Sequence, residues 1–465
     1  MTSESPAQIE TEMMEVFTTS MPEGKETVVE TAEQLPPLTY VDFYPRCLGT
    51  KFAGEPQYAD FQSVVEEANQ WLRSMPQFVV VKCETVESKL NAADFKADFD
   101  NSFCHISSNG KNVYLKGLRL WLRPQGETPA PVQQLAYMTV LPDHTNNNLV
   151  STLAAVAATI SLRVAPDNVL PSFDSLPTML QKLSRHLQQK PLPGKILTVE
   201  TVTFKVMETA SLEKINTENC LGWESGRTTR MYVCGIRLFY EQGQPAFEQI
   251  GYHDEVPDIA QDHENFMHRV RFAPFSSIVS KAAHWLQGQQ NIRAVNFQSL
   301  TFKAERPGGM GPYLIETTQS GFAEAPSLLE TRYIKILRIF YVKDQKSENS
   351  SLYSSVHLTT RLFVPARPAG AGFESRSKTA QRIISWLTAT GVPVLSAETV
   401  RYAVDKDSEG TGVKEDRSDS VATTSAGQQY VTCVRLFFPC EFQEPPPEVV
   451  PQTAEDQWGW GCVIA

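Results

Sequence analysis

Several features that define common protein classes are missing from this chain of 465 residues. No apolar run approaches the roughly 20 residues that a membrane-spanning helix needs, and the segment 154–162 (AAVAATISL) is too short. The eight cysteines include no C-x-x-C pair, so neither a zinc site nor a disulfide framework is indicated. The sequence has no G-x-S-x-G element, no phosphate-binding loop and no kinase signature. We therefore expect no metal, no cofactor and no catalytic residues.

Positive charge is also scarce. The formal net charge is −11 and the isoelectric point is about 5.4, which argues against a general nucleic-acid-binding protein. The N-terminal segment 1–35 is acidic and has neither a basic start nor an apolar core. It is therefore not a secretory signal peptide, and we expect a disordered tail. Scattered, unpaired cysteines indicate a reducing, cytosolic environment.

What the sequence does contain is a fourfold internal repeat. Each copy carries the phrase Tyr-x4-Arg-[Leu/Ile]-[Trp/Phe], and an earlier phrase of the form Glu-Thr-Val or Gln-Ser-Leu precedes it. The arginines are Arg119, Arg237, Arg338 and Arg435. The residues that begin the earlier phrase are Glu84, Glu200, Gln298 and Glu398. An amphipathic helix precedes both phrases and ends near Trp71, His186, Trp285 or Trp386.

The repeats predict an α+β fold of four tandem strand–helix–strand–strand units, paired so that two units share a continuous antiparallel sheet with helices on one face. The units span 36–130, 131–245, 246–350 and 351–441. The third strand of each unit is apolar on both faces and should lie centrally in its sheet. The connections between second and third strands are long, polar and dissimilar, which is typical of solvent loops. The element order resembles tandem units of the effector-binding and SOUL-type haem-binding domains, a resemblance of topology that implies no ligand.

The repeated acids raise a question of role. Glu84, Glu200 and Glu398 fall on the apolar face of their strands, and a buried carboxylate needs a partner. The arginine of the adjoining strand is the obvious candidate, because its guanidinium can hold a carboxylate with two hydrogen bonds. The favoured interpretation is a structural pair that recurs in every unit. The alternative is a ligand site, in which the acid meets a cation or the arginine meets an anion.

The last four residues, Cys462, Val463, Ile464 and Ala465, form a C-a-a-X box of the type that directs farnesylation. The preceding tail, 442–465, is rich in proline and acid, so we expect it to be flexible. Farnesylation of Cys462 would be followed by removal of the last three residues and methylation of the new carboxylate. One prenyl chain anchors a protein weakly, and no lysine or arginine lies between Phe437 and Cys462 to help it.

Two tryptophans offer the second signal that a prenyl anchor needs. Trp458 and Trp460 precede the box directly, and indole rings favour the membrane interface. A motif bound by a protein partner explains them equally well. We expect a protein on the cytosolic side of a membrane, with some of it free in the cytosol. Its partners would be membrane lipid, a prenyltransferase and the enzymes that process the box.

Two classes of function remain open. The first is a non-catalytic, prenyl-anchored binding or scaffold protein, favoured by repetition without a unique catalytic constellation. The second is a small-molecule binding protein with an apolar cleft between paired units and a Glu or Arg at its base. An enzyme of unknown class is a distant third. The discriminating observation is whether Glu200 and Arg237 line a pocket or lie in a filled core.

Overall fold

The computed structural model describes residues 36–50, 55–107, 110–126, 131–145, 173–206, 215–225, 230–260, 271–304, 313–324, 331–343, 353, 355–367, 372–405, 411–422, 427–450 and 463–464. The acidic segment 1–35 lies outside this part of the chain, as do Trp458, Trp460, Cys462 and Ala465. Within it, strands predominate, with 46% of residues in strands and 18% in helices. The α+β class predicted from the repeats therefore holds only coarsely.

Each unit supplies three strands to one sheet. The first strands are β1 (Thr39–Phe43), β7 (Leu135–Val140), β11 (Gln249–Glu255) and β17 (Thr359–Phe363). The second strands are β4 (Phe78–Leu90), β8 (Gly194–Val206), β14 (Ile292–Lys303) and β18 (Ser396–Ala403). The third strands are β6 (Lys111–Pro124), β10 (Arg230–Gln242), β16 (Thr331–Lys343) and β20 (Gln428–Phe438). In all four sheets the third strand pairs antiparallel with both others, which confirms its predicted central position.

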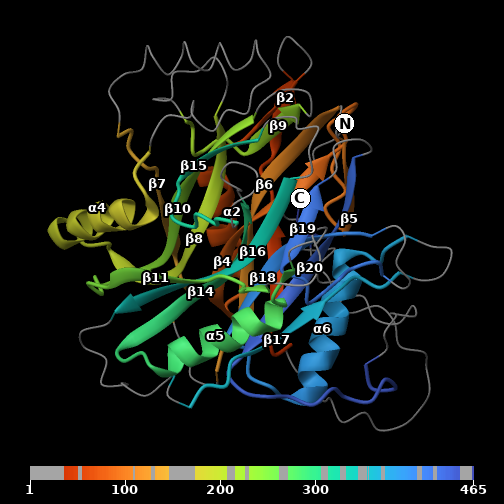
Figure 1. Cartoon of the computed structure of the whole chain (residues 1–465). Coiled ribbons are helices and arrows are strands. Elements are labelled where there is room, and N and C mark those ends of the chain that lie inside the picture. The colour runs from red at the N-terminus through yellow and green to blue at the C-terminus, as the bar shows by residue number, and fades with distance from the viewer. Residues whose placement is uncertain are drawn as a thin grey trace, which may run out of the picture.

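One helix follows the first strand of each unit, at the position that the apolar periodicity predicts. The helices are α2 (Phe61–Ser74), α4 (Leu176–Gln189), α5 (Phe275–Gln287) and α6 (Arg376–Thr390). Asp60 and Ser375 cap α2 and α6 with side-chain oxygens that accept from backbone N–H groups of the first turn. Figure 1 shows α4, α5 and α6 on the outside of the sheets. Two short pairs lie outside these sheets: β2 (Cys47–Thr50) with β3 (Pro56–Tyr58), and β12 (Ile259–Ala260) with β13 (Arg271–Phe272).

The four sheets form a closed, propeller-like ring with the second strands innermost. Each innermost strand contacts the next one around the ring, and β18 contacts β4 to close it. The expected sharing of one continuous sheet by two units is therefore wrong. Instead, each sheet has a short fourth strand donated by the following unit. The donated strands are β9 (Leu221–Ser225), β15 (Gly321–Glu324), β19 (Asp419–Ala422) and β5 (Phe103–Ile106), which pair with β6, β10, β16 and β20 respectively.

The donated strands come from the connections that the sequence suggested were solvent loops. Unit 1 supplies β5 to the sheet of unit 4, so the first and last units are interlocked like the others. Because every sheet is completed by its neighbour, no unit has a complete sheet of its own. The ring therefore has no free break at which a single unit could detach without exposing strand edges.

Four hydrophobic cores each combine the helix and the sheet of one unit with residues of the next unit. The aromatic residue that ends the repeated phrase occupies the same place in all four cores. These residues are Phe239 beside α2, Phe340 beside α4, Phe437 beside α5 and Trp121 beside α6. Each of these four cores is therefore formed mainly by one unit and completed by the next unit around the ring.

The first part of the tail does not extend away from the ring. Phe442 packs edge-on against Trp386 of α6, with ring centroids 5.1 Å apart. Glu444 accepts a hydrogen bond from Trp386 Nε1 and forms an ion pair with Arg361. Val450 is 9% exposed in the same core. Farther on, the backbone of Val463 and Ile464 (β21) pairs in parallel with Asp42 and Phe43 of β1.

Candidate functional site

The residues of the two repeated phrases meet at the inner strands of the ring. Backbone pairing places Glu84 opposite Arg119, Glu200 opposite Arg237, Gln298 opposite Arg338 and Glu398 opposite Arg435. All four arginines are at most 2% exposed. A β-bulge three residues before the acid or amide interrupts three of these strands, so even this irregularity repeats. The sequence predicted the adjacency, and the register holds in every unit.

The ion pair predicted for the three units that carry an acid forms in only one of them. Arg435 Nη1 lies 2.9 Å from Glu398 Oε1. Glu200 forms no ion pair with Arg237 in the described part of the chain, and Arg237 instead donates to Thr139 Oγ1 at 3.0 Å and to the carbonyl of Thr217 at 3.1 Å. The predicted ion pair is wrong for these two residues, because both side chains bond to the Thr85 hydroxyl of unit 1 instead of to each other.

Two arginines take a carboxylate from the first strand, which the sequence reasoning missed. Arg119 holds Asp42 with two hydrogen bonds of 2.6 Å. Arg338 holds Asp254 in the same way, at 2.7 and 2.6 Å. A signal was present, because three first strands carry a tyrosine two residues before this position. The tyrosines Tyr40, Tyr137 and Tyr252 precede Asp42, Thr139 and Asp254 respectively.

The repeated acids serve the preceding unit. Glu200 accepts from the backbone N–H of Thr85 at 3.0 Å and from the Thr85 hydroxyl. The same contact joins Glu398 to Ser299 N at 2.6 Å, Glu84 to Thr399 N at 2.7 Å and Gln298 Oε1 to Thr201 N at 2.9 Å. The four contacts run in one direction around the ring and close it. An innermost strand has a free edge of N–H groups, and these side chains satisfy it.

The arginines follow the same rule. Arg119 donates to Thr399, Arg237 to Thr85, Arg338 to Thr201 and Arg435 to Ser299, at 2.5–3.1 Å. Each hydroxyl residue is therefore held by both the acid or amide and the arginine of the following unit. This explains why the phrase pairs an acid or amide with a hydroxyl residue directly after it.

Burial sets the electrostatics of this network. Desolvation raises the pKa of Glu200, although the charge of Arg237 and the Thr85 hydrogen bonds oppose the rise. Desolvation likewise lowers the pKa of Arg237, against the charge of Glu200. The pKa of Arg119 is raised, since the bidentate Asp42 outweighs the opposing effect of burial. The network is thus most favourable where a carboxylate is directly paired.

A second repeated contact locks each helix to the following unit. The first residue of each helix donates its backbone N–H to a carbonyl of the next unit, just before the donated strand. The donors are Phe61, Leu176, Phe275 and Arg376, and the acceptors are Glu218, Thr318, Asp416 and Asp100, at 2.7–3.0 Å. In three cases the acceptor residue is an acid whose carboxylate also receives the next backbone N–H of the helix. The sequence signal, an acid three residues before the donated strand, went unrecognised.

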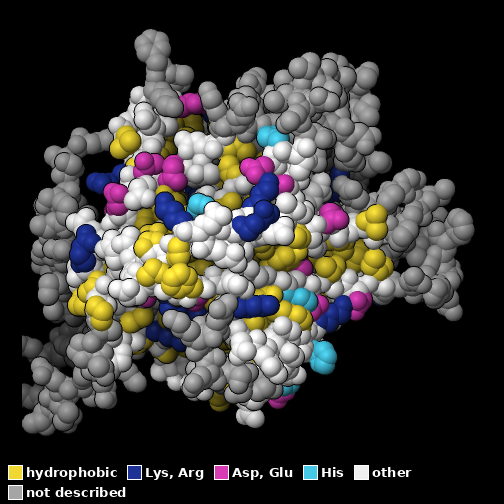
Figure 2. Space-filling view, turned by 90° about the vertical axis from the view of Figure 1, so that its left-hand side faces the viewer, with side chains coloured by type: hydrophobic (Ala, Val, Ile, Leu, Met, Phe, Trp, Pro, Cys, Tyr) yellow, Lys and Arg dark blue, Asp and Glu magenta, His cyan; other side chains and the backbone are white. Residues whose placement is uncertain are grey.

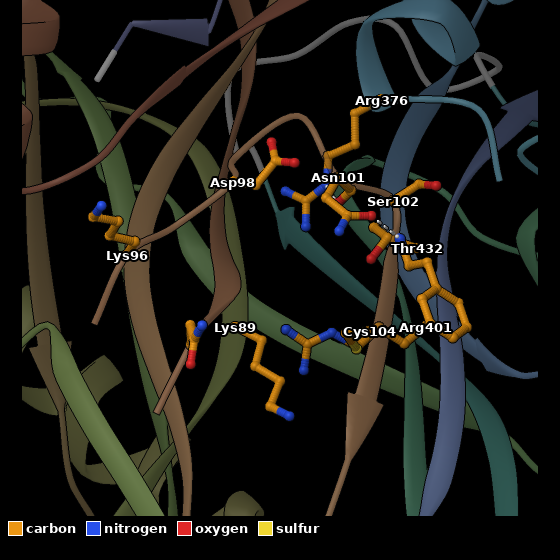
Figure 3. Close-up of a pocket in the computed structure, with 11 residues that line it drawn as sticks. Lys89, Lys96, Asp98, Asn101, Ser102, Cys104, Arg376, Arg401 and Thr432 are labelled. Atoms are coloured by element: carbon orange, nitrogen blue, oxygen red, sulfur yellow. Dashed lines mark hydrogen bonds between the residues drawn. The ribbon is translucent and has the colours of Figure 1, made fainter. Parts of the chain in front are cut away.

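One cavity of about 180 Å³ interrupts this regular arrangement, at the seam between units 4 and 1. Its charged lining consists of Lys89, Lys96, Asp98, Arg376 and Arg401. Figure 3 shows Arg376 entering from the α6 side and Arg401 from the opposite side. Glu200 and Arg237 do not line it. Both residues are buried, at 3% and 0% exposed, and both are hydrogen-bonded to neighbouring residues, which favours a structural role for the pair.

Three further observations concern membrane-spanning helices, metal binding and surface charge. Among the described helices, none has the length and apolar character to cross a membrane. The described residues contain no group of histidine, cysteine and acidic side chains arranged to hold a metal ion. The face in Figure 2 mixes acidic and basic side chains with scattered apolar ones, and no broad basic field covers it. The lipidation residue Cys462, the interface residues Trp458 and Trp460, and Ala465 lie outside the described residues.

Comparison with protein-family models, with curated proteins and with solved structures gives no match for this chain.

Proposed function

We propose that this protein is a non-catalytic ring scaffold held at the cytosolic face of a membrane by a farnesyl group on Cys462. The scaffold role is supported by the cyclic network of hydrogen bonds between the repeated acids or amide and the hydroxyl residues of the preceding units. The residues that accept these bonds are Glu84, Glu200, Gln298 and Glu398. In this network the same buried polar contact joins each of the four pairs of neighbouring units. A catalytic constellation would need a chemically distinct arrangement in one unit.

A rigid ring suits a scaffold for a physical reason. The cores and donated strands connect every unit to both neighbours, so the relative positions of the four sheets are fixed around the ring. The loops that differ between units then present different surfaces on one frame. Partners bound by two such loops would be held at a set distance from each other.

The tether is supported by the C-a-a-X box, and Trp458 and Trp460 would add interfacial affinity to a single weak lipid anchor. The pairing of Val463 and Ile464 with β1 adds a condition. A prenyltransferase takes the last residues in an accessible form, so β21 must leave β1 before modification. The prenyltransferase would therefore reach the C-a-a-X box only in those molecules whose β21 has left β1.

Intact-mass spectrometry of the protein expressed in eukaryotic cells tests the tether. The expected mass corresponds to loss of Val463, Ile464 and Ala465, addition of one farnesyl group and methylation. Cell fractionation of the Cys462→Ser variant should move the protein from membranes to the cytosol. An unmodified C-terminus ending at Ala465 would reject the tether and leave a soluble ring scaffold.

The second candidate is a small-molecule binding protein, and the seam cavity is the observation that favours it. The expected cleft was apolar and contained a repeated Glu or Arg. The cavity is instead polar and cationic, and it involves neither Glu200 nor Arg237. A binding role would therefore belong to one seam and not to the repeated unit.

A further inference from the structure

The seam between units 4 and 1 differs from the other three at one equivalent position. The residues whose backbone N–H groups dock the helices to the next unit are apolar in three cases, Phe61, Leu176 and Phe275. In α6 the residue is Arg376. Since Leu176 fills the same place in unit 2, the fold itself does not require a cation there.

The environment of this position explains where the arginine goes. Phe61 lies over the guanidinium of Arg237, 3.9 Å from its ring centroid, and Phe275 lies over Arg435 at 3.8 Å. At the fourth seam Tyr40 takes that place over Arg119, at 3.5 Å. A second cation stacked there would be repelled by Arg119. Arg376 instead turns into the cavity.

Arg376 is buried without a carboxylate. Arg376 is only 8% exposed. Nε donates to the Asn101 carbonyl at 3.1 Å, and Nη1 donates to Tyr44 Oη at 3.3 Å and Ser88 Oγ at 3.2 Å. All three acceptors are neutral, and Nη2 has no bond to the described residues. A buried guanidinium that lacks a counter-charge is costly, and a bound anion removes that penalty.

The rest of the cavity strengthens the positive field. Lys89, Lys96 and Arg401 line it together with Arg376, and Asp98 is the single acid of the lining. Glu87 forms an ion pair with Arg401, with Nη1 to Oε2 at 3.7 Å. Among the described residues, Lys89 donates only to the His105 carbonyl. The chain as a whole has a net charge of −11 and should not attract anions in general. Attraction for an anion in this cavity therefore comes from the local excess of cations.

The volume of the cavity limits the class of ligand that it can hold. A volume of about 180 Å³ corresponds to roughly six water molecules at about 30 Å³ each. That is enough for one phosphate group with a short organic substituent, and too little for a nucleotide or a folded peptide. Two arginines with lysines nearby suit a tetrahedral dianion, which can accept from several donors at once.

We propose that this cavity, here called the seam site, binds a small soluble phosphate monoester, with the phosphate held by Arg376, Arg401 and Lys89. The ligand would contact β4 and the β5 connection of unit 1 together with α6 and β18 of unit 4. Binding would therefore clamp the seam at which the ring closes. The site goes beyond the scaffold and tether proposed above and does not depend on the lipid.

The test uses the full chain made in bacteria, which carries no prenyl group. Thermal unfolding and isothermal titration are followed with inorganic phosphate, glycerol 3-phosphate and acetate at constant ionic strength. We expect glycerol 3-phosphate and phosphate to raise the midpoint and acetate to leave it unchanged. Equal shifts with all three anions would overturn the assignment.

The decisive variant is Arg376→Leu, which copies Leu176 of unit 2. It should fold, with a midpoint no lower than the parent, and it should bind glycerol 3-phosphate at least tenfold more weakly. Lys281→Met, which removes an ion-paired lysine of α5 far along the sequence from the site, should bind like the parent. Unchanged binding by Arg376→Leu would refute the proposal.

A last arm separates a free ligand from a lipid headgroup. Vesicles of phosphatidylcholine, with and without phosphatidic acid, are sedimented with the unprenylated protein. We expect no co-sedimentation with either vesicle, because a partly enclosed cavity of about 180 Å³ accommodates a soluble ligand more readily than a headgroup held in a bilayer. Sedimentation that requires phosphatidic acid and is lost in Arg376→Leu would overturn the soluble-ligand assignment.

Discussion

Replacing Glu200 in two ways tests the cyclic network directly. Glu200→Ala removes the acceptor for the Thr85 N–H and hydroxyl at the seam between units 1 and 2. Glu200→Gln keeps an acceptor oxygen in place, because Gln298 occupies the equivalent position in unit 3 and accepts from Thr201. The first variant should be destabilised and the second should not.

The magnitudes follow from the contacts. Hydrogen bonds to a charged group contribute about 1.5–3 kcal/mol each, and two are lost in Glu200→Ala. Relief of the buried carboxylate's desolvation offsets part of this, as the raised pKa of Glu200 indicates. Arg237 keeps its bonds to Thr139, Thr85 and Thr217, so it is not left without partners. We expect a net loss of about 2–4 kcal/mol for the alanine variant and a change within about 1 kcal/mol for the glutamine variant.

The pH dependence gives an independent check. A carboxyl whose pKa is raised by folding contributes stability below its unfolded pKa of about 4.3, and this contribution is lost as pH rises through the folded pKa. Glu200→Gln has no such titration. Its stability relative to the parent should therefore be greatest near neutral pH and should decline as pH falls toward about 4.3.

Urea unfolding followed by tryptophan fluorescence, between pH 4 and pH 7.5, measures both effects. Equal destabilisation by alanine and glutamine would refute the reasoning, because it would mean that the charge of Glu200 is essential. An unchanged midpoint for Glu200→Ala would show that the Thr85 contact does not hold the two units together.

Three further predictions follow from other seams and from the tail. Asp100→Ala removes the carboxylate that accepts from Ser377 N and Oγ at 2.7 Å, and it should lower stability by about 1–2 kcal/mol in urea unfolding. Gly427→Ala, directly before β20, places a Cβ 2.6 Å from His105 Nε2 at a φ of +73°, and it should cost about 1–3 kcal/mol, whereas Gly222→Ala on the donated strand β9 meets nothing within 4 Å and should be tolerated in the same assay. Ala465→Leu should redirect modification from farnesyl to geranylgeranyl, and Trp458→Ala with Trp460→Ala should weaken membrane partition without changing the lipid, as mass spectrometry and fractionation would record.

The sequence alone determined what is local in this protein. Strand alternation and helix periodicity located the three strands and the helix of each unit, since these patterns depend on neighbouring residues only. The repeated phrases also predicted that Glu84 stands opposite Arg119 and that the same register recurs in each unit. Side-chain partners did not follow from register, because Glu200 and Arg237 stand opposite each other yet both bond to Thr85 of the preceding unit.

Tertiary structure decided everything that joins one unit to another. The donated strands β5, β9, β15 and β19 arise from dissimilar connections, and a short strand that pairs with another unit's edge has no strong pattern of its own. The apolar face of each helix shows in the sequence that this face is buried. It does not show that residues of the next unit help to cover it, as they do in four cores. Arg376 is an unremarkable residue in the sequence, and it became a candidate ligand-binding residue only when the ring placed it beside Lys89 and Arg401, because the field in a cavity is set by residues far apart in the chain.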